Sequence, residues 1–175
     1  MKTLSDQAYK NRICMGNYIC AGIAMVLVVL QFIPFWGCYQ CSTCGEGRIL
    51  SINEYIWLAK NHKDGLTAVL RDYYIPGFQV SQVVPTSVLM QVASLIALAM
   101  CFIRPAKFTA TFFALAAGVT CVTGYLTQPV YQMGQMWQLH LAVGVATLLA
   151  ALGVYLFAFC RAYQKAKAEI AAEAA

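Results

Sequence analysis

Three closely spaced cysteines are the residues of this chain best suited to chemistry. Cys38, Cys41 and Cys44 form a C-x2-C-x2-C pattern that places three thiols within seven residues. Thiols at this spacing suit metal coordination or thiol-disulfide exchange. In an oxidising compartment the ordinary outcome is one structural disulfide, with the third cysteine free or paired elsewhere. We therefore predict a disulfide here, with redox catalysis by the three cysteines as an alternative.

Two sets of side chains could bind a metal ion. A tetrahedral zinc site on the three cysteines needs a fourth ligand, for which His62 is the candidate nearby in the sequence. Met133, Met136 and His140 share one helical face at i, i+3 and i+7, and thioethers with an imidazole suit Cu(I). Methionines more often fill helix contacts, and a lone histidine usually hydrogen-bonds a neighbour. The cofactor is thus left open, and we expect none.

Composition identifies the elements that must position these residues. The chain has 175 residues, of which 61% are hydrophobic and 11% charged, whereas soluble domains carry about 25% charged residues. Stretches of about 20 apolar residues can cross a bilayer as helices. Four such stretches predict an all-α integral membrane protein, an antiparallel four-helix transmembrane bundle with spans at 13–36, 83–103, 108–126 and 136–160.

Charge predicts which connections lie on which side of the membrane. Eight of the 12 Lys and Arg residues fall in segments 1–12, 104–107 and 161–175. Segment 37–82 holds four basic and four acidic residues, and 127–135 holds no charge. Because positive charge marks the cytoplasmic side, we expect both termini inside. Segments 37–82 and 127–135 are then expected outside. The net charge of +5 is then a topology signal and does not indicate nucleic-acid binding.

The long outer loop, 37–82, is expected to be folded and helical. Ser51 and Glu54 stand at capping-box spacing before an apolar stretch, which predicts a helix over 52–60. Asp64 can cap a second amphipathic helix that ends at Pro76. The loop then forms a platform for a partner or rests on the headgroup layer. The candidate contact residues are Trp57, Tyr73 and Tyr74.

The predicted spans contain no Asp, Glu, Lys or Arg. Ion-coupled carriers usually place such groups within the membrane, so this class of protein is disfavoured. Small residues that allow close helix packing are Ala110, Ala114, Gly118 and Gly144. Neutral polar residues that could bridge helices are Asn17, Gln31, Gln91, Ser94, Thr120 and Thr123.

Two classes of four-span protein share part of this layout. Membrane enzymes that make disulfides with a quinone are similar in helix number and in the outer C-x2-C, but they need a second cysteine pair, and 127–135 has none. Claudin-like proteins are similar in their long folded first loop and in a tryptophan before loop cysteines, here Trp36, but their W-G-L-W-C-C pattern is absent. The sequence is assigned to neither class.

The functional hypothesis is a non-enzymatic membrane subunit whose outer loop contacts partners. Such a subunit would serve as a scaffold or form oligomers, which could include a pore. Its expected partners are the lipid bilayer and either further copies of the chain or a larger membrane complex. The alternatives are a membrane thiol oxidoreductase that uses Cys38, Cys41 and Cys44, and a metal-binding membrane protein.

Overall fold

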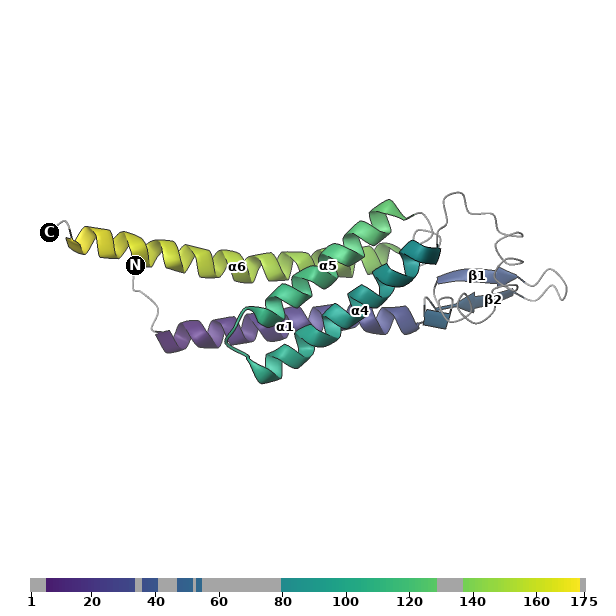
Figure 1. Cartoon of the computed structure of the whole chain (residues 1–175), viewed down its shortest axis with the longest axis horizontal. Helices are drawn as coiled ribbons and strands as arrows, with labels where there is room; N and C mark the ends of the chain where they lie inside the picture. The colour runs from purple at the N-terminus through teal and green to yellow at the C-terminus, as the bar shows by residue number, and fades with distance from the viewer. Residues whose placement is uncertain are drawn as a thin grey trace.

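The computed structural model describes residues 6–33, 36–40, 47–51, 53–54, 80–128 and 137–173. Within these ranges the helices each contain a segment long and apolar enough to cross a membrane, which indicates a multi-pass membrane protein. Figure 1 shows them as a bundle with a two-stranded hairpin at one end. The elements are α1 (Asp6–Phe32), β1 (Trp36–Gln40), β2 (Gly47–Leu50), α4 (Val80–Ile103), α5 (Thr109–Thr127) and α6 (Trp137–Glu173).

The helices pack in a closed ring in which α1 contacts α4 and α6, and α5 contacts α4 and α6. Asp6 at the start of α1 is paired with Arg161, and Leu30 near the end of α1 contacts His140 near the start of α6. The two helices therefore run in opposite directions. We call the end of the bundle that carries β1 and β2 the hairpin end, and the end that holds Asp6 and Arg161 the basic end (Figure 1).

α1, α4 and α6 are longer than the predicted spans, whereas α5 has the predicted length and is displaced by one residue. α1 starts at Asp6 and stops at Phe32, two residues before Pro34, and a proline disfavours helix at the residue that precedes it. α6 continues to Glu173 through a sequence rich in Ala, Lys and Glu, which are strong helix formers. Its 37 residues span about 55 Å, well beyond the roughly 30 Å of a hydrocarbon core.

The hairpin was not predicted. The helices expected in the loop begin at residues 52 and 64, after both strands. β1 and β2 are antiparallel, with Cys38 opposite Ile49 and Tyr39 opposite Arg48, and the register shifts between Trp36 and Cys38. The local signal was present: aromatic and aliphatic residues flank a connection that contains Ser, Thr and Gly.

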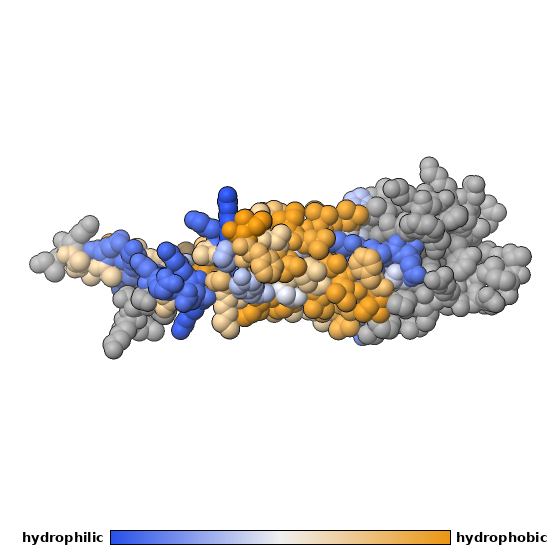
Figure 2. Space-filling view, turned by 90° about the horizontal axis from the view of Figure 1, so that it is seen from below, coloured by the Kyte–Doolittle hydropathy of each residue, from blue (hydrophilic) through white to orange (hydrophobic). Residues whose placement is uncertain are grey.

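The core of the bundle is built from small side chains. Its central cluster combines alanines with Cys20 and Cys101 and draws residues from all four of the helices described. Leu27, Met90 and Tyr125 are also buried, but many other large apolar side chains point outward and form the apolar band in Figure 2. Lipid tails are as apolar as leucine, so helices in a membrane associate through close packing and not through burial of large side chains.

α5 and α6 pack closely at two glycines. A Cβ on Gly144 would lie 2.6 Å from the Sγ of Cys121, and a Cβ on Gly118 would lie 3.1 Å from the carbonyl oxygen of Gly144. Ala110 and Ala114, about two turns and one turn before Gly118 on α5, are fully buried in the central cluster. The structure thus places all four residues that the sequence singled out for packing at buried helix contacts.

Candidate functional site at the hairpin end of the bundle

Three amide side chains connect the segment after β2 to two helices. Nε2 of Gln91 on α4 donates to Oε1 of Gln31 on α1 over 2.6 Å and to Oδ1 of Asn53 over 2.7 Å. The Gln31 side chain is fully buried, at 0% exposure. We call Gln31, Asn53 and Gln91 the loop junction. It joins α1, α4 and the segment after β2 through hydrogen bonds between neutral groups.

A capping box holds Asn53 in place. The backbone N–H of Ser51 donates to Oε2 of Glu54 over 2.8 Å, and the N–H of Glu54 donates to Oγ of Ser51 over 3.2 Å. These reciprocal bonds fix the backbone around Asn53. Local sequence therefore sets the position from which Asn53 meets Gln91. The remainder of the helix predicted over 52–60 lies outside the described residues.

His140 joins three helices beside the junction. Its Nε2 lies 3.2 Å from the carbonyl oxygen of Leu30, the residue before Gln31. Its ring stacks on Tyr125 of α5 with centroids 5.5 Å apart, and its carbonyl oxygen accepts a hydrogen bond from the Cys121 thiol. The His140 side chain is only 2% exposed. This histidine therefore contributes to helix packing at the hairpin end.

Buried polar atoms at this end have spare hydrogen-bonding capacity. Nε2 of Gln31, Nδ2 of Asn53 and Oε1 of Gln128 have no hydrogen-bond partner in the described structure. Nε2 of the same Gln128 amide donates to Oγ1 of Thr86 over 3.2 Å. An unsatisfied buried polar group costs about 1–3 kcal/mol, so such groups favour an added partner. The site is thus suited to polar recognition as well as to anchoring the loop.

A second polar centre lies near the basic end. The fully buried Asn17 donates from Nδ2 to the carbonyl oxygens of Pro105 and Lys107, each over 2.7 Å. Its Oδ1 accepts from the hydroxyl of Thr111, and its backbone oxygen accepts from the Cys101 thiol. One side chain therefore ties α1 to the turn between α4 and α5 and to α5 itself.

Other neutral polar residues in the spans bond within their own helix. Ser94 donates to the Met90 carbonyl, and Thr120 donates to the Ala116 carbonyl. Thr123 does the same on α5. Of the six polar residues that sequence suggested as bridges, Asn17, Gln31 and Gln91 bridge elements in the structure. Asn53 and Tyr125 were not predicted as parts of the site, although Asn53 lies inside the predicted capping-box motif.

Several predicted site residues lie beyond what the structure describes. Of Cys38 only the backbone is placed, on β1. The disulfide, redox and metal predictions for the three cysteines therefore stay predictions, as do the platform contacts. Within the described part of the chain no group of three or more His, Cys, Asp or Glu could hold a metal ion. The residues outside the description are Cys41, Cys44, Trp57, His62, Tyr73, Tyr74, Met133 and Met136.

The cysteines with described side chains are free thiols. Cys20, Cys101 and Cys121 are buried between helices, Cys14 is half-buried and Cys160 is exposed. Buried thiols behave as small hydrophobic groups, so the first three belong to the packing of the bundle.

The chain matches no known family model, no curated protein and no solved structure. Its function must therefore be argued from the site itself. The loop junction is uncharged and partly buried, and its amides are arranged to hold a loop segment on the bundle.

Proposed function

We propose that this protein is a four-span membrane scaffold subunit that holds its first extracytoplasmic loop as a platform for a partner. The arrangement proposed is an antiparallel bundle with both termini in the cytoplasm. Basic residues at the basic end support this orientation through the positive-inside rule, and Figure 2 shows hydrophilic residues at that end of the apolar band. Those with described positions are Lys10, Arg12, Arg104, Lys107, Arg161, Lys165 and Lys167.

The observation that carries the proposal is the loop junction. A connection that only joins two helices does not need a buried hydrogen bond to them. Here Gln91 bonds both Gln31 and Asn53, so the segment after β2 is fixed to α1 and α4. A surface held in one position loses less conformational entropy when a partner binds, which favours association. The junction therefore supports a loop that is presented to a partner.

The polar groups of the bundle support the same interpretation. Asn17 uses its side chain to join helices and a turn, and the packing role of His140 is similar. The spare amide donors of Gln31 and Asn53 are hydrogen-bonding groups that a docked segment could use. We propose that the partner is a second copy of the chain or another membrane protein, contacted through the loop and its aromatic residues Trp57, Tyr73 and Tyr74.

The test compares complexes isolated from the native membrane. After cross-linking in the membrane and extraction in mild detergent, the native mass is measured for the wild type, Gln91→Leu and Asn53→Ala. Gln138→Leu is the matched control, because Gln138 is exposed on α6 at the hairpin end. We expect a complex larger than one chain for the wild type and the control, and loss of that complex for the two junction variants.

Two results would contradict the proposal. A wild-type protein that is strictly monomeric and brings down no partner removes the scaffold function. A complex that survives unchanged in both junction variants shows that the anchored loop is not the contact surface. Circular dichroism of each variant separates loss of the partner from loss of the helical bundle.

A further inference from the structure

An open cleft separates α1 and α6 in the half of the bundle near the basic end. Its volume is about 270 Å³, and its walls include the small residues Gly16, Cys20, Ala150 and Gly153. The helices touch closely at Gly16, where an added Cβ would lie 2.7 Å from Val154. At Gly153, by contrast, an added Cβ would meet no atom within 4 Å. The cleft therefore exists because small residues leave space beside a close helix contact.

The dimensions of the cleft match one leaflet of a bilayer. Its lining on α1 runs from Arg12 to Cys20, which is about 12 Å along a helix. Half of a hydrocarbon core is about 15 Å. The lining is almost entirely apolar, and the cleft is open at the outside of the bundle, where the lining residue Ile19 is exposed. An acyl chain is the molecule that fills such a space in a membrane.

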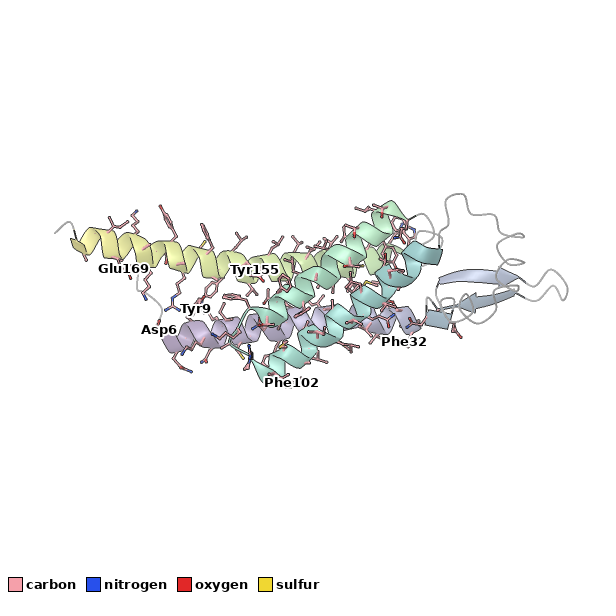
Figure 3. All side chains as sticks on the ribbon, viewed as in Figure 1. Asp6, Tyr9, Phe32, Phe102, Tyr155 and Glu169 are labelled. Carbon is pink, nitrogen blue, oxygen red and sulfur yellow. The ribbon has the colours of Figure 1, made fainter. Side chains whose placement is uncertain are left out.

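A positive charge stands at the basic end of the cleft. The guanidinium of Arg12 lies over the Phe157 ring, 5.8 Å from its centroid. The neighbouring carboxylate of Asp6 is already bound by Arg161 at 2.5 Å, and Arg161 also lies over the ring of Tyr9. Figure 3 shows Asp6 and Tyr9 at the start of α1, beside α6. Arg12 forms no ion pair with a residue of the described structure, so its charge is available to a ligand.

We propose that this cleft binds one anionic phospholipid of the cytoplasmic leaflet, with an acyl chain between α1 and α6 and the phosphate on Arg12. Guanidinium groups bind phosphate through paired hydrogen bonds. Basic pockets between transmembrane helices on the cytoplasmic side recognise anionic headgroups in the same way. The assignment to the cytoplasmic leaflet rests on the proposed orientation, but the site is independent of the scaffold function, since it lies at the opposite end from the loop junction.

The test measures lipid binding to the purified full-length protein by native mass spectrometry. Phosphatidylglycerol and phosphatidylcholine are titrated separately in detergent. We expect the wild type to retain one phosphatidylglycerol per chain with about fivefold preference over phosphatidylcholine, as one interfacial arginine provides. Arg12→Gln should lose the preference but still bind both lipids, and Lys10→Gln, at an exposed position outside the cleft, should behave as the wild type.

The space for the acyl chain is tested with two glycine variants. Gly153→Leu places a side chain in the cleft and should abolish retention of both lipids. Gly22→Leu is the matched control, because Gly22 also faces open space but lies outside the cleft lining. Equal retention of the two lipids by the wild type would overturn the headgroup assignment. Identical lipid binding by Gly153→Leu and Gly22→Leu would overturn the cleft as the site.

Discussion

Replacing Asn17 with alanine should destabilise the bundle more than any exposed polar substitution. The side chain of Asn17 is fully buried and makes two hydrogen bonds of 2.7 Å to backbone carbonyls, in addition to the bond from Thr111. In Asn17→Ala all three bonds are lost. The carbonyls of Pro105 and Lys107 lose their donor in a turn that directs α5 back along α4.

The expected loss follows from the energies of hydrogen bonds in membrane proteins. Each such bond contributes about 0.6 kcal/mol on average and at most about 1.7 kcal/mol. Three bonds therefore give a decrease of about 2 kcal/mol in the free energy of unfolding. Thr111→Val removes a single bond and should cost about 0.6 kcal/mol.

The assay is equilibrium unfolding of purified protein in mixed micelles, followed by circular dichroism. Thr123→Ala is the control, because the Thr123 hydroxyl bonds a carbonyl of its own helix at an exposed position. We expect this variant to stay within about 0.5 kcal/mol of the wild type. An Asn17→Ala variant as stable as Thr123→Ala would refute the reasoning that Asn17 joins α1 to the turn.

Further predictions concern packing and topology. Gly144→Ala should lower the free energy of unfolding by about 1–3 kcal/mol in the same assay, because its Cβ would meet the Cys121 sulfur at 2.6 Å. Adding Cys121→Ala to this variant should restore part of the lost stability. Gly153→Ala should not destabilise the protein, because Gly153 faces open space. Equal losses of stability in Gly144→Ala and Gly153→Ala would contradict the close packing at Gly144. In intact membrane vesicles, Cys160 should react with an impermeant maleimide only when the cytoplasmic face is accessible, whereas labelling from the outer face alone would reverse the proposed orientation.

The membrane helices could be found from sequence because their apolar length is a strong local signal. The predicted positions of the helix ends were less accurate, since a helix can continue beyond the hydrocarbon core wherever its residues favour helix. This is how α6 reaches Glu173. The β hairpin was missed because strands of four or five residues carry little periodicity.

The candidate site was predictable in its residue types but not in its partners. Gln31 and Gln91 stood out as polar residues within apolar spans, which favours a bridging role. Their shared contact with Asn53 depends on where the loop lies on the bundle, and no local pattern contains that information. The stacking of Tyr125 on His140 is a contact between helices and was hidden for the same reason.

The central claim is that the loop is fixed to the bundle through Gln91, and a double-mutant cycle with Asn53 measures this most directly. The free energy of unfolding is determined for the wild type, Asn53→Ala, Gln91→Ala and the double variant. A bond of 2.7 Å between these side chains predicts a favourable coupling energy of about 0.6 to 1.7 kcal/mol. Effects that add to within about 0.3 kcal/mol would contradict the claim, because the two residues would then not interact.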